Sequence, residues 1–163
     1  MNLKLGVNQH YKVECFDKVG KLKWTEEFDN LVVTAGLNKY LDATLKTGLA
    51  APAWYVGLKD TGTVVAGDTL ASHAGWAELT STVYSGNRPA FTPGTIASGS
   101  VNNSGSKAAF TITGADTIYG ALMCDAASGT SGTLLGAGDF TAPRAVEIGD
   151  TLNVTITASI SSS

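Results

Sequence analysis

Residues 67–79 read GDTLASHAGWAEL and bring the side chains that hydrolases use into a short stretch. Asp68, Ser72 and His73 are the residue types of an orienting acid, a nucleophile and a base. Ser72 and His73 are neighbours in sequence, however, and neighbouring side chains of an extended segment point to opposite faces. No GxSxG motif surrounds the serine. We therefore predict a structural corner here, expect no catalytic residue, and do not expect an enzyme.

In this interpretation Trp76 plugs one end of the domain, while His73 and Asp68 bind backbone groups of a long connection that lacks a sheet ladder. Arg88 follows in YSGNRPAF, directly before Pro89. The residue before a proline favours extended backbone, so this dipeptide predicts a turn or extended segment. We expect Arg88 to pair with a carboxylate, or alternatively to make an interface contact.

Metal-binding and cofactor-binding patterns are absent from the sequence. The two histidines, His10 and His73, belong to no HExxH motif, and Cys15 and Cys124 form no CxxC pair. Asp-containing turns match no EF-hand loop, and no phosphate-binding loop is present. We expect no metal and no cofactor. Each cysteine lies in a strand-like run, which predicts two buried thiols; a disulfide is the alternative.

Composition narrows the class of protein and its partners. The 163 residues are one domain's worth, and only 15% are charged, below the roughly 25% typical of globular proteins. A net charge of -3 offers no basic field for nucleic acid. No run of about 18 apolar residues could span a membrane, and no signal peptide is evident. We expect a protein made in the cytoplasm, with neither nucleic acid nor membrane as partner.

The N-terminal third alternates apolar and polar residues in two runs. Inward positions are expected for Tyr11, Val13 and Cys15, and then for Leu22, Trp24 and Phe28, with Gly20 closing the turn between the runs. Residues 1–33 therefore read as a β-ribbon, either an arm or part of the core. An isolated ribbon is only marginally stable, so it must lie on another surface. We favour the surface of a neighbouring subunit.

One short helix is expected at residues 35–47. Apolar side chains recur there at helical spacing, namely Leu37, Tyr40, Leu41 and Leu45. Thr34 is suited to cap its start and Gly48 to stop it.

Short β runs separated by Gly, Ser and Asn turns fill the rest of the chain. Residues 146–160 alternate around Gly149 and Asp150, which predicts a hairpin with Val146, Ile148, Leu152 and Ile160 on a buried face. This spacing predicts an all-β fold, a jelly-roll-like β-sandwich over residues 34–163 with an N-terminal β-hairpin and one short α-helix.

The segments FDNLVVTAGLNKYLD, WYVGLKD, DTLASHAGWAEL, YSGNRPAF, TIYGALMCD and GDTLNVTIT, in this order, resemble a family of small structural proteins of tailed bacteriophages. The resemblance spans nearly the whole chain, but its marks are packing and turn residues. It implies a head decoration (cement) protein that binds the major capsid protein on the outside of the capsid and bridges capsomers. It brings no catalytic, cofactor-binding or metal-binding residue with it.

Multivalent attachment to symmetric capsomers favours a homotrimer or homodimer. Two alternatives remain. A tail or neck structural protein would share the same composition. A carbohydrate-binding module would need a row of exposed aromatic side chains, whereas Trp24, Trp54 and Trp76 are expected to face inward or to fill corners.

Overall fold

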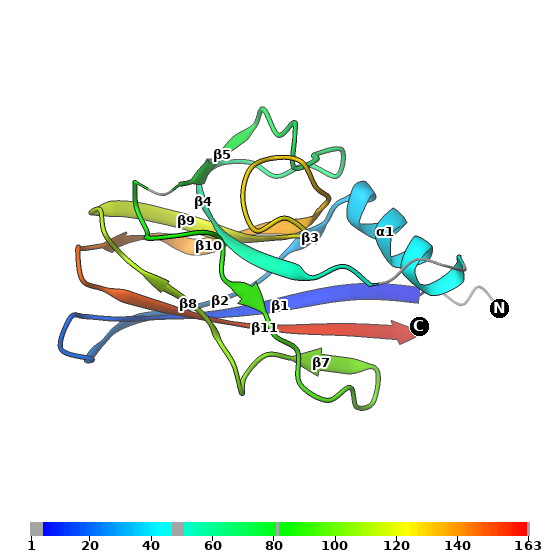
Figure 1. Cartoon of the computed structure of the whole chain (residues 1–163), viewed down its shortest axis with the longest axis horizontal. Helices are drawn as coiled ribbons and strands as arrows, with labels where there is room; N and C mark the ends of the chain where they lie inside the picture. Colours follow the sequence, from blue (N-terminus) through cyan, green and yellow to red (C-terminus); the bar gives the residue numbers. More distant parts are fainter. Residues whose placement is uncertain (1–4, 47–50, 81, 163) are drawn as a thin grey trace.

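Two antiparallel β-sheets face each other and one short helix lies at one end of the molecule (Figure 1). The computed structural model describes residues 5–46, 51–80 and 82–162. The first sheet has the order β2-β1-β11-β7, with β8 also paired to β11, and the second has the order β3-β10-β9-β4-β5, with β6 also paired to β4. The prediction of an all-β sandwich with one short helix is confirmed.

The strands of the first sheet are β1 (Leu5–Phe16), β2 (Leu22–Asp29), β7 (Ser100–Asn102), β8 (Ala108–Thr111) and β11 (Thr151–Ser162). Those of the second are β3 (Leu31–Val32), β4 (Trp54–Gly62), β5 (Trp76–Leu79), β6 (Ala90–Phe91), β9 (Asp116–Cys124) and β10 (Leu134–Val146), and the helix α1 is Thr34–Leu45. Alternate side chains of both sheets fill the core between them, among them Val13, Phe28, Val56, Leu58, Phe110, Met123, Leu135, Leu152, Val154 and Ile156.

The N-terminal ribbon is built into this sandwich. β1 pairs with β2 on one side and with β11 along twelve residues on the other, so it is an interior strand of its sheet. Gly20 closes the β1–β2 turn at φ 83°, as expected. Tyr11, Val13 and Cys15 are fully buried. The favoured interpretation, an arm lying on a neighbouring subunit, therefore differs from the structure, because the ribbon finds its partner strand at the far end of its own chain.

The inward face of β2 also differs from the prediction. A register shift between Cys15 and Phe16 leaves Leu22 half exposed. Glu26, which lies between Trp24 and Phe28 on the same face, is buried instead. Its carboxylate accepts hydrogen bonds from Thr141 Oγ1 at 2.7 Å and from Arg144 Nε at 2.6 Å on β10. A buried acid is tolerated because the opposite sheet supplies its partners.

Helix α1 forms where it was expected but is held differently. Its N-cap is Val33, without a side-chain cap, and Thr34 donates its backbone N–H to Ala66 O at 2.9 Å. Gly36 is the buried residue of the helix, and a Cβ at this position would lie 2.2 Å from Leu135 O of β10. The backbone of the helix therefore sits directly on the sheet. The proposed stop at Gly48 lies outside the described residues.

Helix α1 contacts the sheet through Gly36, so the apolar stripe predicted for the helix is not its buried face. Leu37, Leu41 and Leu45 are 41%, 54% and 76% exposed, and Tyr40 is partly buried against the core. Periodicity identified the helix correctly but not the side that it buries.

Residues 146–160 do not form the predicted hairpin. β10 and β11 belong to different sheets, and residues 147–150 form a corner that carries the chain from one sheet to the other. Ile148 is 68% exposed at this corner and Ile160 is 43% exposed near the other end of β11. Alternation reports a half-buried strand in either sheet, so it could not show whether two successive strands pair with each other.

Candidate functional site

The stretch at residues 67–79 is a packed corner. Trp76 is 6% exposed and donates its Nε1–H to Asp68 Oδ2 at 2.9 Å, and the same oxygen accepts the N–H of Val65 at 2.9 Å. The ring of His73 stacks on Trp76 with centroids 4.1 Å apart, and its Nδ1 lies 3.0 Å from Thr69 O. The side chains are thus engaged within the chain, as the packing interpretation predicted.

Ser72 takes no part in this arrangement through its hydroxyl. Its backbone N–H donates to Thr69 Oγ1 at 3.0 Å, and among the described residues no hydrogen bond joins the Ser72 side chain to His73. The structure therefore does not bring the two residues together as a nucleophile and base.

A buried lysine completes the same corner. Lys59 of β4 is fully buried, and its ammonium lies 5.9 Å from the Trp76 ring. Its three N–H groups meet Asp139 Oδ1 at 2.6 Å, Asp60 O at 3.0 Å and Gly62 O at 2.6 Å. All three donors of the Lys59 ammonium are therefore engaged within the chain.

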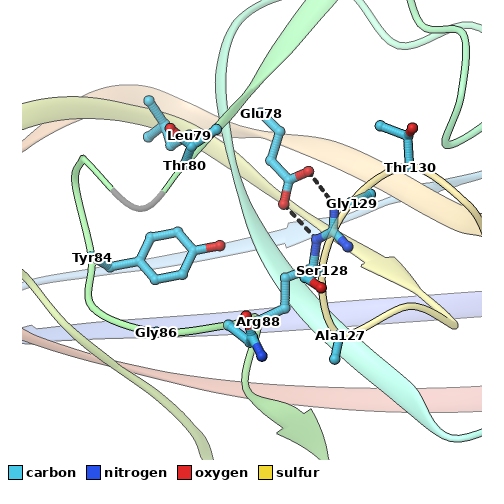
Figure 2. Close-up of a pocket in the computed structure, with 11 residues that line it drawn as sticks. Glu78, Leu79, Thr80, Tyr84, Gly86, Arg88, Ala127, Ser128, Gly129 and Thr130 are labelled. Atoms are coloured by element: carbon cyan, nitrogen blue, oxygen red, sulfur yellow. Dashed lines mark hydrogen bonds and ion pairs between the residues drawn. The ribbon is translucent and has the colours of Figure 1, made fainter.

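A pocket opens next to this corner. Its volume is about 280 Å³, and its walls come from β5, from the segment before β6 and from the β9–β10 loop: Glu78, Leu79, Thr80, Tyr84, Gly86, Asn87, Arg88, Ala127, Ser128, Gly129 and Thr130 (Figure 2). Sequence reasoning singled out only Arg88 of this set. The other walls are ordinary turn and strand residues, which carry no signal until the fold brings them together.

Arg88 and Glu78 form the floor of the pocket as a two-point ion pair. Arg88 Nε and Nη2 donate to the two carboxylate oxygens of Glu78, each at 2.6 Å, and the side chains are 5% and 14% exposed. Arg88 also donates to Ala126 O at 2.7 Å and to Gly129 O at 2.9 Å, which ties the β9–β10 loop to β5. The Glu78 hydrogen bonds raise the pKa of Arg88. The expected carboxylate partner of Arg88 is confirmed.

Tyr84 lines the facing wall. Its residue is 4% exposed, and its ring packs edge-on against Phe110 with centroids 4.9 Å apart. Its hydroxyl points toward the Glu78–Arg88 pair (Figure 2). Burial, together with the Glu78 carboxylate, raises the pKa of Tyr84 to about 12. The hydroxyl is therefore protonated and available as both donor and acceptor.

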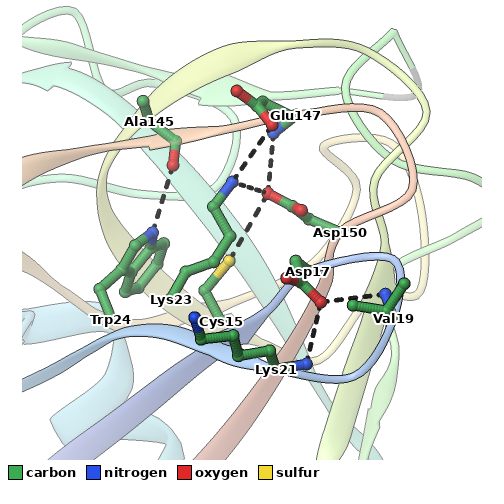
Figure 3. A network of polar contacts seen from close by, with 9 residues as sticks. All are labelled: Cys15, Asp17, Val19, Lys21, Lys23, Trp24, Ala145, Glu147 and Asp150. Carbon is green, nitrogen blue, oxygen red and sulfur yellow. Dashed lines mark hydrogen bonds and ion pairs between the residues drawn. The ribbon is translucent and has the colours of Figure 1, made fainter.

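The cysteines are both free and buried, which confirms the thiol prediction over the disulfide. Cys15 lies near the end of β1, in a polar network with Lys23, Asp150 and Glu147 (Figure 3). Lys23 Nζ donates to Asp150 Oδ2 at 2.7 Å. Burial would raise the pKa of Asp150, but the bonds from Lys23 and Glu147 hold it below its ordinary value. Burial raises the pKa of the Cys15 thiol to about 12, so this thiol is not reactive.

Among the described residues, no group of three or more His, Cys, Asp or Glu side chains converges on a point where a metal ion could bind. No helix in the described ranges is long and apolar enough to cross a membrane.

The end of the sandwich that carries α1 is different in character. Two hollows of about 250 and 280 Å³ share Tyr40, Ile96, Val101 and Ala158 as lining residues. Ile96 and Ile160 are exposed and line these hollows, and helix α1, whose Tyr40 also lines them, carries the exposed side chains of Leu37, Leu41 and Leu45. We call these five side chains and the hollows the apolar end. Two ion pairs involve the helix and its C-cap, Lys46 with Asp42 at 2.8 Å and Lys39 with Asp125 at 3.5 Å.

These features define a β-sandwich that carries a small polar pocket and an apolar end. The family model described as "Podophage GP4 fiber I protein gp80" matches residues 32–161, from β3 to β11. The chain therefore belongs to this family and is a structural protein of a bacteriophage virion. No curated protein matches it.

Proposed function

We propose that this chain is a structural subunit of a podophage tail fibre. The observation that carries the proposal is the match to a fibre protein family over residues 32–161. This match favours the tail alternative over the head-decoration role that the sequence resemblance implied. The fold supports a structural rather than a catalytic role for this protein, because the side chains of Asp68, His73 and Lys59 make their hydrogen bonds within the chain.

Self-association through the apolar end is part of this proposal. Leu41 and Leu45 of α1 are exposed, and Tyr40 of the same helix lines two hollows whose walls are mainly apolar. Contiguous apolar patches of this kind on a soluble protein mark interaction sites. The charged side chains of α1 and of its C-cap, Lys39, Asp42 and Lys46, are paired, which reduces like-charge repulsion between two copies that meet at the helix. A closed homotrimer or homodimer uses the same patch on every subunit.

Location in the virion tests the main proposal. Gold-labelled antibody against this protein, imaged on intact virions by electron microscopy, is expected to mark the tail. Particles that lack the protein are expected to keep their DNA on heating as well as complete particles do. Label on the head shell, together with DNA release at lower temperature, would restore the decoration role, and absence from the virion would refute both.

The oligomeric state tests the second part. In light scattering coupled to size exclusion, the wild-type protein is expected to elute as a dimer or trimer and the double variant Leu41→Gln/Leu45→Gln as a monomer. Val19→Gln is the matched control, because Val19 is 80% exposed in the β1–β2 turn at the other end of the molecule. An oligomer that survives the double variant would place the subunit contact elsewhere.

A further inference from the structure

We propose that the pocket between Tyr84 and the Glu78–Arg88 pair binds a neutral sugar unit through two adjacent hydroxyl groups. The inference concerns this pocket alone and does not depend on where in the virion the protein lies. It rests on an unused hydroxyl, on the charge of the pocket floor and on the size of the cavity.

The hydroxyl of Tyr84 is the first observation. The ring is packed against Phe110, a contact that phenylalanine would make equally well. The hydroxyl belongs to a residue that is 4% exposed, it points into the pocket, and it has no hydrogen-bond partner among the described residues. The hydroxyl is accessible from the pocket, because the buried side-chain atom without a partner among the described residues is Asn30 Oδ1 and not the oxygen of Tyr84. A structural role for the pocket explains Glu78 and Arg88, which tie the loop to β5, but it does not explain this group.

The charge of the floor selects the class of ligand. Glu78 and Arg88 neutralise each other, so an anion would face the carboxylate and a cation would face the guanidinium. Four of the five N–H groups of Arg88 are used, two by Glu78 and one each by Ala126 and Gly129, which leaves one on Nη1. The carboxylate oxygens keep lone pairs. A hydroxyl that donates to Glu78, beside an oxygen that accepts from Arg88 or Tyr84, satisfies all three residues.

The cavity size and its rim fit one sugar ring. At about 280 Å³ it lies just below the roughly 300–1,000 Å³ of sites for drug-sized ligands. The rim carries the side chains of Thr80, Asn87, Ser128 and Thr130, whose hydroxyl and amide groups can both donate and accept. Such a rim suits the remaining hydroxyls of a sugar. A single ring of this size is expected to bind with a Kd on the order of 1 mM.

Saturation-transfer NMR tests the proposal on the full-length protein. The probes are the methyl glycosides of glucose, galactose, mannose and rhamnose, with glucuronate and glucosamine as charged counterparts. At least one neutral glycoside is expected to receive saturation and to show a millimolar Kd. No transfer to any neutral glycoside, or transfer confined to a charged sugar, would overturn the assignment.

Two matched variants locate the binding. Tyr84→Phe removes one hydroxyl and is expected to weaken the Kd about 5- to 10-fold, which is the effect of one hydrogen bond. Tyr119→Phe removes a hydroxyl that lies outside the pocket and is expected to bind as the wild type does. Circular dichroism of both variants checks that the fold is kept. Equal affinity of the folded Tyr84→Phe variant and the wild type would exclude this pocket as the sugar site.

Discussion

The corner around Trp76 and the pocket around Tyr84 lie next to each other in sequence and in space, but they differ in whether their polar side chains are hydrogen-bonded within the chain. In the corner, Asp68 accepts from Trp76 and Val65, and Lys59 satisfies three acceptors. In the pocket, the hydroxyl of Tyr84 faces open space with no partner among the described residues. Polar side chains that are hydrogen-bonded within the chain stabilise the fold, whereas those without such a partner are available to a ligand.

This contrast reverses the ranking that residue types suggest. A serine, a histidine and an aspartate are the residue types of a catalytic site, but here the histidine and the aspartate stabilise a loop. A tyrosine between a strand and a turn is expected to serve packing alone, but the hydroxyl of Tyr84 remains available for a hydrogen bond. Only the hydrogen bonds distinguish the two cases, and removal of single groups measures the difference in stability.

The largest effect is expected on breaking the pocket floor. Arg88→Ala leaves the Glu78 carboxylate without its counter-charge and frees the β9–β10 loop, so the free energy of unfolding should fall by about 3–5 kcal/mol. Urea denaturation monitored by tryptophan fluorescence measures it. Lys107→Ala is the control, because its pair with Glu14 is exposed and should contribute less than about 1 kcal/mol. Equal losses in the two variants would contradict a structural role for the Arg88 pair.

Breaking the corner should cost less. Trp76→Phe keeps most of the packing but removes the N–H donated to Asp68, and we expect a loss of about 2 kcal/mol in the free energy of unfolding. Asp68→Ala and the double variant complete a cycle that isolates this bond. Additive losses in the cycle would mean that the two side chains do not interact.

The histidine of the corner should matter little. His73→Ala removes a stacking partner from one face of Trp76 at the surface, for an expected loss of about 0.5 kcal/mol. His10→Ala is the control, because this surface histidine lies beside Asp29 and stacks on no aromatic ring among the residues that the structure describes. Thermal unfolding of the variants measures both. A hydrolytic activity of the wild-type protein that is lost in the His73 variant alone would support the catalytic interpretation.

The smallest effect on stability is expected at the pocket hydroxyl. Tyr84→Phe should change the free energy of unfolding by less than about 0.5 kcal/mol at neutral pH, because the hydroxyl has no partner to lose. A loss of about 2 kcal/mol would show that the hydroxyl is bonded within the chain and would place the pocket in the same class as the corner.

Alkaline pH sharpens the same comparison. The pKa of Tyr84 rises from 10.0 to about 12 in the folded protein, so between these values the unfolded chain has released a proton that the folded chain keeps. Stability therefore falls as the pH rises through this range. Tyr84→Phe removes this contribution, and denaturation at pH 9 and pH 11 should show a smaller loss for the variant than for the wild type. An identical loss would mean that Tyr84 titrates normally.

Much of the architecture follows from local pattern. Alternation placed β1 and β2, Gly20 placed their turn, and the 3.6-residue period placed α1, because these signals depend only on near neighbours in the chain. The same pattern identified the corner as packing, since adjacent side chains cannot act as a catalytic pair.

Pairing over long distances was decided by the tertiary structure. The first described strand joins the last, and the chain changes sheets at residues 147–150; neither is visible in a period of two. Helix α1 packs on the sheet through Gly36 and not through its leucine stripe, because contact with the backbone of Leu135 requires a residue without a side chain. The pocket gathers Glu78, Arg88 and a loop some forty residues away. The sequence by itself determined which segments are strands and helix, whereas only three-dimensional contact decided which polar groups were left without partners.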